Sequence, residues 1–414
     1  MLSACVFAKA DDNGSYSGFA PYSRFGVGDL FSGGSAYNMT MGGVGIALRN
    51  NRYLNYLNPA AVTARDSLSF MSDFSVYQNN KIFKQGSSTS ATNLFNVNDF
   101  VFSFPITTRG GAMIGIKPYS AMGYDFHYYE TDPKVLSEVG NVSHNYSGQG
   151  SIYQIFAAAG VNLFKNLNLG VEYIHYTGNI QKNYEQNLTD AASIGMKDNT
   201  EMILSANTAK FGLQYEQKIG SKFTLYLGAT YTMNARLGGF VNRDITSGSL
   251  AISSVSDTLS KTSTPLFLAS EKGVGIGFSY NRKLRGEFDY TRSNWSECNF
   301  SDHVFAPSNR ESFRLGFEYI PKPNDVRYYR NIIAYRAGAY YIKDYYTVNG
   351  SPVSSRGITL GVTLPIFQWY NGVSLGIEIG QRGSLKNNLI LENYVNFNIG
   401  INLFDIWFQQ YRYE

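Results

Sequence analysis

The end of the chain alternates strictly between apolar and polar residues. From Val395 to Leu403 the odd positions are Val, Phe, Ile, Ile and Leu, whereas the even positions are Asn, Asn, Gly and Asn. A period of two predicts a β-strand with one apolar and one polar face. The polar face carries amides and glycine rather than long charges, and the aromatic pair Trp407-Phe408 follows. This pattern is typical of a transmembrane β-barrel strand, with lipid on one face and the lumen on the other.

The same alternation recurs in earlier segments. Together with the final strand they predict a transmembrane antiparallel β-barrel of about 14 strands, an even number, as a single-chain bacterial barrel requires. The fold class is therefore all-β. The earlier segments cover residues 68–76, 100–106, 111–126, 153–163, 167–173, 211–215, 223–231, 273–278, 284–290, 313–319, 335–341, 358–364 and 373–379.

The connections between these segments alternate between short and long. Short connections belong on the periplasmic side of such a barrel and long ones outside. A soluble β-sandwich would also alternate, but it would not keep one face so free of charge or sort its connections in this way. The short connections lie near 107–110, 165–166, 218–221, 282–284 and 367–371, and the long polar loops near 79–97, 131–148, 180–200, 243–263 and 297–307.

The N-terminal part of the chain does not alternate. Residues 11–66 contain clusters of glycine and small residues, which permit tight turns and close backbone approach. A phosphate-binding loop is a weak interpretation, because no strand precedes the glycines and no Lys-Ser/Thr follows them. We expect residues 11–66 to form a plug, or hatch, inside the lumen, residues 67–408 to form the barrel, and residues 409–414 to form a periplasmic tail.

The first ten residues read as the end of a secretory signal peptide. Ala8-Lys9-Ala10 has the A-x-A form of a cleavage site, and a polar stretch follows. The segment Leu2-Ser3-Ala4-Cys5 also resembles a lipoprotein cleavage box, with Cys5 as the lipidated residue. We favour cleavage after Ala10, because a barrel is held by its lipid-facing belt. Both alternatives send the protein across the inner membrane, and the predicted barrel then places it in the bacterial outer membrane, in contact with its lipid and lipopolysaccharide.

Composition narrows the function classes. Charged residues make up 16% and aromatic residues 15% of the 414 residues, with 32 Tyr and 41 Gly. These values fit a barrel with aromatic girdles and small lumen positions. The net charge of +4 includes no basic cluster, so we expect no nucleic-acid partner. No apolar run is long enough for a membrane-spanning helix.

Candidate chemistry is sparse. The two cysteines and four histidines are scattered and show no metal-ligand spacing, so we expect no metal and no cofactor. Some outer-membrane barrels are proteases or lipases, and His144 or His303 could in principle meet an Asp in a loop. No pairing of nucleophile and base is visible, so we expect that the protein is not an enzyme.

Three short motifs in residues 11–66 carry a family resemblance. They are Arg24 within Tyr22-Ser-Arg-Phe-Gly, the stretch Gly42-Gly-Val-Gly-Ile-Ala47, and Asn58-Pro59-Ala60. The chain resembles the FadL/TodX family of outer-membrane hydrocarbon transporters, and it is similar to the FadL-like barrels of Bacteroidota. The resemblance implies a hatch whose candidate residues are Arg24, Gly43, Gly45, Asn58, Pro59 and Ala60.

The third predicted strand, residues 111–126, contains residues that weaken a β-ladder. Pro118 cannot donate a hydrogen bond, and Gly123 adds no side chain to the sheet. In FadL-type transporters a kink in the third strand opens the wall sideways beside the hatch. By this resemblance a ligand would leave laterally past Asn58, Pro59 and Ala60; the alternative is a plain bulge without a passage. The candidate residues of the opening are Pro118, Tyr119, Ser120, Gly123 and Tyr124.

Two functions follow from this resemblance. The first is a channel for passive uptake of hydrophobic small molecules of the long-chain fatty acid or hydrocarbon type. The alternative is a scaffold subunit of a protein secretion or outer-membrane assembly complex, as PorV-type barrels are, with other envelope proteins as partners. The Tyr- and Arg-rich segment 321–330, which we expect to be a structured periplasmic extension, and residues 409–414 favour a partner.

Charged residues also fall on the polar face of several predicted strands. Buried charge is costly unless it is paired, so we expect these side chains to pair across the barrel or to hold the hatch. Such a lumen argues against an open porin and against a continuous apolar tunnel. The residues are Glu172, Lys210, Glu216, Arg285, Glu287, Asp289, Arg314, Glu318, Arg336 and Glu378.

Overall fold

The computed structural model describes residues 17–66, 69–188, 195–248, 250–259, 265–300, 304–366 and 371–406. The predicted signal peptide, Cys5, His303 and the tail 409–414 lie outside these residues.

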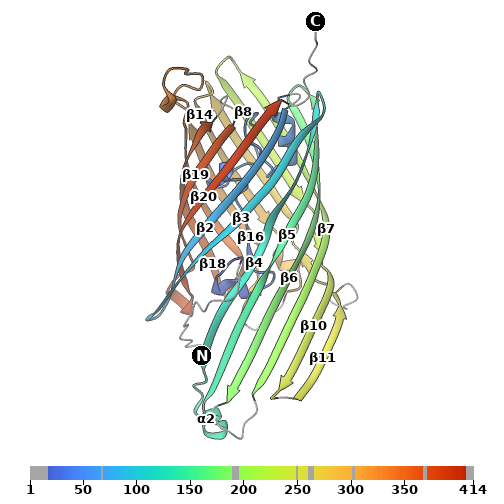
Figure 1. The fold of residues 1–414 in the computed structure, drawn as a ribbon, viewed down its shortest axis with the longest axis vertical. Coiled ribbons are helices and arrows are strands. Elements are labelled where there is room, and N and C mark those ends of the chain that lie inside the picture. Colours follow the sequence, from blue (N-terminus) through green and yellow to red (C-terminus); the bar gives the residue numbers. More distant parts are fainter. Residues whose placement is uncertain are drawn as a thin grey trace.

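Within the described residues, fourteen antiparallel strands close into a barrel (Figure 1), as predicted. The first barrel strand, β2, pairs with the last, β20, from Ser69↔Ile406 to Lys84↔Leu391, and this pairing closes the sheet. The barrel strands are β2 (Ser69–Gln85), β3 (Ser88–Thr107), β4 (Gly110–Tyr129), β5 (Val142–Phe164), β6 (Leu167–Leu188), β7 (Met196–Ile219), β8 (Phe223–Thr232), β13 (Glu271–Tyr280), β14 (Leu284–Ser293), β16 (Arg310–Tyr319), β17 (Ala334–Val348), β18 (Ser351–Ile366), β19 (Asn371–Arg382) and β20 (Leu391–Ile406).

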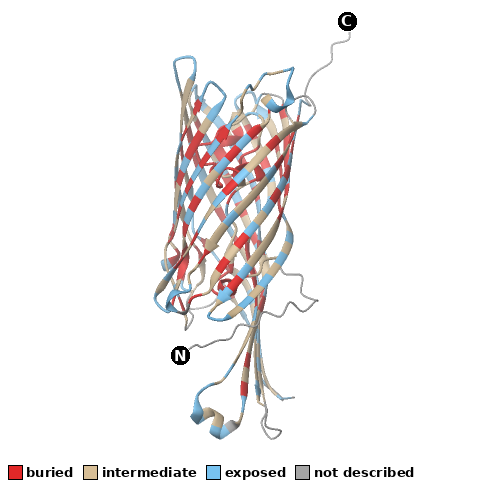
Figure 2. Cartoon of the chain, turned by 90° about the vertical axis from the view of Figure 1, so that its left-hand side faces the viewer, coloured by how far each residue is buried: buried red, intermediate tan, exposed pale blue. Residues whose placement is uncertain are grey.

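The alternation of apolar and polar residues determines which face of each strand meets lipid. In β20, Phe397 and Ile399 are 44% and 47% exposed, whereas Asn398 and Asn402 are each 3% exposed. Figure 2 shows the resulting alternation of buried and exposed positions along the barrel strands. An exposed apolar face of this extent would be unstable in water, so it is the lipid-facing belt of an outer-membrane barrel.

Several of the predicted long loops are in fact strands. The segments 79–97, 180–188 and 196–200 belong to β2, β3, β6 and β7, which extend beyond the belt, and β10 (Gly238–Ser247) and β11 (Leu250–Thr258) add a hairpin to β7. Together β4–β7, β10 and β11 form a sheet that projects from the long-loop end of the barrel, at the bottom of Figure 1. The loop prediction was wrong because these strands have polar residues on the outer face and therefore lack the apolar period of the belt.

Polar side chains bridge neighbouring strands of this projecting sheet. The Gln149 amide donates to Gln181 Oε1 at 3.1 Å, and Lys197 Nζ lies 2.9 Å from Glu185 Oε1. Such polar ladders are compatible with water and not with the lipid core. The projecting sheet is therefore outside the membrane, and the short hairpins at the opposite end are periplasmic.

The hatch runs inside the barrel from the projecting sheet toward the short hairpins. Its elements are η1 (Pro21–Arg24), β1 (Asp29–Leu30), α1 (Ala36–Met39) and η2 (Pro59–Ala64). η1 contacts β4, α1 contacts β19 and β20, and η2 contacts β5, β6 and β7, so the hatch touches opposite walls.

The remaining elements connect barrel strands. Within the described residues, no helix is long and apolar enough to cross a membrane. The connecting elements are α2 (Pro133–Val139), β9 (Ala235–Arg236), β12 (Phe267–Leu268), η4 (Trp295–Glu297), β15 (Phe305–Pro307), η5 (Tyr329–Asn331) and η6 (Lys386–Asn388).

Candidate functional site

Strands β3 and β4 pair over only part of their length. Their ladder runs from Thr107↔Gly110 at the short hairpin to Phe100↔Ile116, and among the described residues it goes no further. On its other edge β4 stays paired with β5 as far as Tyr129, with one register shift between Pro118 and Ser120. The wall therefore divides between β3 and β4 in its outer half, while β4 itself remains a continuous strand.

The hatch occupies the edge of β4 that β3 leaves unpaired. Leu30 of β1 pairs with Ser120, and the Phe31 N–H donates to the Tyr119 carbonyl at 2.9 Å. Further along, the Ala20 N–H donates to the Gly123 carbonyl at 2.8 Å. Residues 18–31 thus replace β3 as the neighbour of β4.

A glycine makes this close approach possible. Gly28 has a φ of +94°, which favours glycine, and a Cβ at this position would collide with the Ala121 carbonyl. The hatch backbone can therefore lie directly against β4 only because residue 28 has no side chain.

The candidate opening residues lie along this edge of β4. Pro118 and Tyr119 form the register shift, and the Tyr119 ring lies 4.6 Å from the ring of Tyr176. Ser120 is fully buried, and its Oγ has no hydrogen-bond partner among the described residues. Tyr124 is buried beside Gly123. The five residues therefore share one strand segment.

The candidate hatch residues do not form one cluster. The Arg24 guanidinium lies over the Tyr146 ring at 4.7 Å, on the projecting sheet. Asn58 instead donates to the Leu213 carbonyl of β7 at 3.1 Å and caps η2 by accepting from the Ala60 N–H at 3.0 Å.

The expected position of Asn58, Pro59 and Ala60 beside the opening stays a prediction, and their printed contacts are with other strands. A Cβ on Gly170 of β6 would collide with Pro59 and Ala60, so these residues lie against β6. The element η2 also contacts β4, but the main-chain hydrogen bonds to the opening segment come from residues 18–31.

The hatch backbone packs directly on glycines of the barrel wall. A Cβ on Gly228 would collide with the Ile46 carbonyl, and a Cβ on Gly338 would collide with the Gly42 nitrogen. The alternation of glycine with apolar residues was visible in the sequence, but the sequence did not show that these glycines contact the hatch. Glycine at these luminal positions removes the side chain that would otherwise separate barrel and hatch.

Two buried carboxylates of β14 bind the hatch backbone. Asp289 Oδ2 accepts hydrogen bonds from the N–H groups of Gly45 at 2.7 Å and Ile46 at 3.0 Å. Glu287 Oε1 accepts from the Ala47 N–H at 2.7 Å. These contacts place Gly45 in the hatch–barrel interface, and they agree with the expectation that luminal charges hold the hatch.

Luminal arginines bind the other side of the same hatch segment. Arg314 Nη1 donates to the Gly42 carbonyl at 2.7 Å, which places the backbone beside Gly43 against β16. The Arg336 guanidinium lies 4.0 Å from the centroid of the Tyr37 ring and donates to Glu318 Oε2 at 2.8 Å. The hatch is thus fixed between β14, β16 and β17.

A further arginine, which the sequence analysis missed, fixes the segment beside the opening. Arg382 of β19 lies 2.9 Å from Asp29 Oδ1, 2.8 Å from Asp344 Oδ2 and 3.8 Å from Glu392 Oε2. It is a lone basic residue in a Gln-Arg-Gly stretch, and no local pattern in the sequence identifies its partners.

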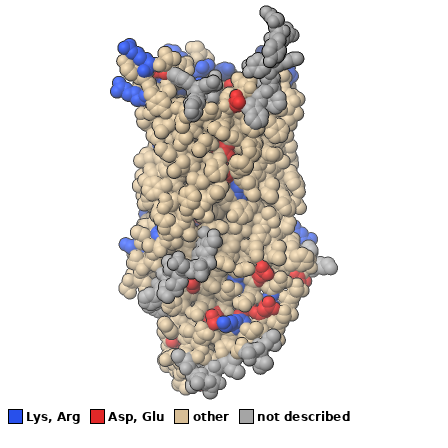
Figure 3. All heavy atoms as spheres, viewed as in Figure 1, with Lys and Arg blue, Asp and Glu red and all other residues tan. Residues whose placement is uncertain are grey.

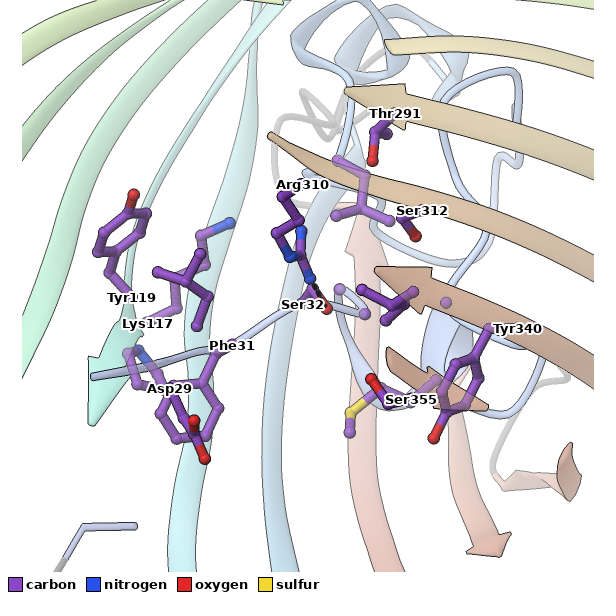
Figure 4. Close-up of a pocket in the computed structure, with 18 of the residues that line it drawn as sticks. Asp29, Phe31, Ser32, Lys117, Tyr119, Thr291, Arg310, Ser312, Tyr340 and Ser355 are labelled. Atoms are coloured by element: carbon purple, nitrogen blue, oxygen red, sulfur yellow. Dashed lines mark hydrogen bonds between the residues drawn. The ribbon is translucent and has the colours of Figure 1, made fainter. Parts of the chain in front are cut away.

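A cavity of about 360 Å³ lies between the hatch and the luminal wall. Figure 4 shows its labelled residues, among them Asp29 and Phe31 of the hatch facing Lys117 and Tyr119 of β4, with Arg310 across the cavity. The lining mixes aromatic rings with charges of both signs, so this cavity is not an apolar tunnel. Its position beside Tyr119 places it next to the division in the wall.

The described residues offer no candidate site for a metal ion. They contain no group of three or more His, Cys, Asp or Glu side chains that could hold a metal ion. Cys298 is buried and unpaired.

The comparisons with known proteins agree with the barrel. The sequence profile of the BamG family matches residues 1–414, while no curated protein matches the chain. The fold resembles the CymD monoaromatic hydrocarbon channel, with 14% identity and a TM-score of 0.58 over 90% of this chain and 97% of that one.

Two toluene transporters have a similar fold. TodX of Pseudomonas putida has 13% identity and a TM-score of 0.58, over 92% of this chain and 99% of its own. TbuX of Ralstonia pickettii has 12% identity and a TM-score of 0.57, over 90% of this chain and 98% of its own. The matched structures are channels and transporters rather than enzymes. By sequence the chain belongs to the BamG family, and by structure it has the fold of the FadL-type outer-membrane barrels.

Proposed function

We propose that this protein is an outer-membrane channel for passive uptake of hydrophobic small molecules of the long-chain fatty acid or hydrocarbon type. The observation that carries the proposal is the end of the β3–β4 ladder at Phe100↔Ile116, beyond which hatch residues cover the edge of β4. The similar fold of the CymD and TodX channels supports it.

A lateral exit between β3 and β4 fits the chemistry of such a ligand. The axial route would take an apolar molecule past charged groups such as Asp289 and Arg314, and on into water. A sideways exit delivers it directly to the lipid core, which is the favourable environment for apolar surface. The movement required is local, because Leu30 and Phe31 are joined to β4 by few main-chain hydrogen bonds. No cofactor or energy source is needed.

Substitutions in β4 test this proposal. In P118V/G123V, valine at both positions would favour a regular strand that can pair with β3. We expect uptake of radiolabelled toluene and oleate, by cells that lack other channels for them, to fall to the level of cells without the protein. The matched control is P105V, a proline of β3 within the paired region. Unchanged uptake by P118V/G123V would count against lateral exit.

A second candidate function is a scaffold for other envelope proteins, and the connection between β16 and β17 favours it. Val326 at its tip is 90% exposed and Tyr328 is 47% exposed. Asp325 holds the turn by accepting from the Arg327 N–H at 2.8 Å. Hydrogen bonds from Asn331 and from this N–H keep the pKa of the Asp325 carboxyl below its ordinary value. An ordered turn with an exposed apolar tip is a feature of protein-binding surfaces.

Extraction in mild detergent at the native expression level, followed by native mass spectrometry, separates the two functions. A scaffold would appear in a stoichiometric complex, which V326E/Y328A should release. Y129A provides the control, because Tyr129 is a similarly exposed aromatic residue (64%) at the opposite end of the barrel. A monomer that carries an apolar small molecule would support the channel and count against the scaffold.

A further inference from the structure

The periplasmic hairpins carry basic residues without acidic ones. Four connections, β3–β4, β5–β6, β7–β8 and β13–β14, contain five exposed Lys or Arg side chains and no Asp or Glu, and Lys218 at the end of β7 adds a sixth. The six are Arg109, Lys165, Lys218, Lys222, Arg282 and Lys283. None of the six forms an ion pair with another described residue. Lys and Arg side chains are visible along the upper rim in Figure 3. We call these six residues the basic rim.

Each member of the basic rim lies within three residues of the apolar belt. The exposed apolar neighbours are Ile106 (60%), Phe164 (69%), Ile219 (53%) and Tyr280 (48%). These side chains mark the end of the lipid-facing surface, so a Lys or Arg just beyond them reaches the level of the lipid headgroups.

The distribution of the basic rim favours lipid over a protein partner. The four hairpins follow one another around the barrel from β3 to β14, so the charges form an arc and not a compact patch. The β16–β17 connection continues the arc with Lys322, Arg327 and Arg330 against the single Asp325. An arc at headgroup level matches the lipid annulus, whereas a soluble protein would contact only one sector of it.

The opposite end of the barrel has a mixed charge. There, acidic residues accompany the basic ones and some form ion pairs, as Arg243 does with Asp198 at 2.5 Å and Lys197 with Glu185 at 2.9 Å. The turns of the basic rim differ in that they contain no acidic residue beside the basic ones.

We propose that the basic rim binds the headgroup phosphates of anionic phospholipids, such as phosphatidylglycerol, in the periplasmic leaflet of the outer membrane. Basic side chains near an anionic lipid surface gain Coulomb energy that falls off within a Debye length. The protein would therefore collect anionic lipid around its periplasmic end, and this property is independent of whether it acts as a channel or a scaffold.

The test uses the full-length protein in mixed micelles with equimolar phosphatidylglycerol and phosphatidylcholine, and native mass spectrometry to count bound lipids. We expect wild-type protein to retain phosphatidylglycerol preferentially, and high salt to weaken this preference. K165Q/K222Q/K283Q should reduce the ratio of bound phosphatidylglycerol to phosphatidylcholine by at least roughly fivefold. The matched control, K84Q/K272Q/K386Q, removes the same number of positive charges at the outer end. It should keep the wild-type ratio of bound phosphatidylglycerol to phosphatidylcholine.

Three results would overturn the proposal. The first is that wild-type protein retains both lipids equally, and the second is that the control variant loses its lipid preference as much as K165Q/K222Q/K283Q does. The third is that K165Q/K222Q/K283Q keeps the wild-type lipid ratio but releases a stoichiometric acidic protein. The last result would assign the basic rim to a protein partner. Heat-modifiable migration on a gel verifies that each variant remains a folded barrel.

Discussion

The carboxylate of Asp289 on β14 lies 2.7 Å from the backbone nitrogen of Gly45 in the hatch, and both groups are buried. D289A would leave the N–H groups of Gly45 and Ile46 without an acceptor, at a cost of about 2–4 kcal/mol. We expect faster deuterium uptake in the peptide that contains residues 41–48, as measured by hydrogen–deuterium exchange mass spectrometry. D257A, on the exposed strand β11, is the control and should leave that peptide unchanged. Unaltered protection in D289A would contradict this role of the carboxylate.

A methyl group on Gly338 of β17 should separate barrel and hatch. In G338A the new Cβ would meet Met41 and Gly42, so the hatch backbone must move, at a cost of about 1–3 kcal/mol. We expect a lower midpoint of thermal unfolding in detergent, measured by intrinsic fluorescence. Gly238 provides the control, since a Cβ there would make only an ordinary contact at 3.4 Å. Equal midpoints for G338A and G238A would show that the hatch tolerates the extra atom.

Arg382 neutralises three carboxylates at once. R382A would leave Asp344 and Glu392 buried without this cation and Asp29 with only Lys81 at 3.9 Å, which should destabilise the protein by about 3–5 kcal/mol. Because Asp29 belongs to the hatch segment beside β4, we expect increased protease cleavage within residues 18–31. R356A, an exposed arginine of β18, is the control. If R382A were as resistant to protease as the wild-type protein, this role of Arg382 would be excluded.

The histidine of the projecting sheet should titrate at low pH. His144 is buried beside Tyr184, whose hydroxyl lies 2.8 Å from Nδ1, and burial lowers the pKa of His144 below its ordinary 6.5. The unfolded chain then binds more protons than the folded one, so the stabilisation is complete above pH 6.5 and is lost as the pH falls toward the lowered pKa. The pKa of His144 can be measured by carbon-13 NMR titration of labelled histidines, with H144Q to assign its signal. A midpoint at or above 6.5 would contradict the prediction.

The barrel was predictable because the membrane imposes one repeated rule. Segments such as Val395–Leu403 and Phe313–Tyr319 alternate strictly, since one face meets lipid and the other the lumen. Where a strand leaves the lipid, as in residues 180–188, the strict alternation ends and the sequence is mostly polar. These strands were therefore predicted as loops.

The contacts of the hatch were not predictable from local pattern. Asp289 and Gly45 are 244 positions apart in the sequence, and only the closed barrel brings them together. The glycine motifs indicated close packing but did not identify the wall. For that reason the sequence did not reveal that Asn58–Ala60 contact β6 and β7.

We propose that hydrophobic molecules leave between β3 and β4, past the hatch residues that cover β4. Leu30 and Ser120 are direct partners in the β1–β4 pairing, so L30C/S120C in a C5S/C298S background places two thiols within disulfide range. F100C/I116C, the last pair of the β3–β4 ladder, is the matched control.

The decisive measurement is uptake of radiolabelled toluene by cells that express these variants, before and after oxidation. We expect that oxidation of L30C/S120C abolishes uptake, that a reductant restores uptake, and that oxidation of F100C/I116C has no effect. Full uptake through an oxidised, disulfide-linked L30C/S120C protein would contradict lateral exit at this position.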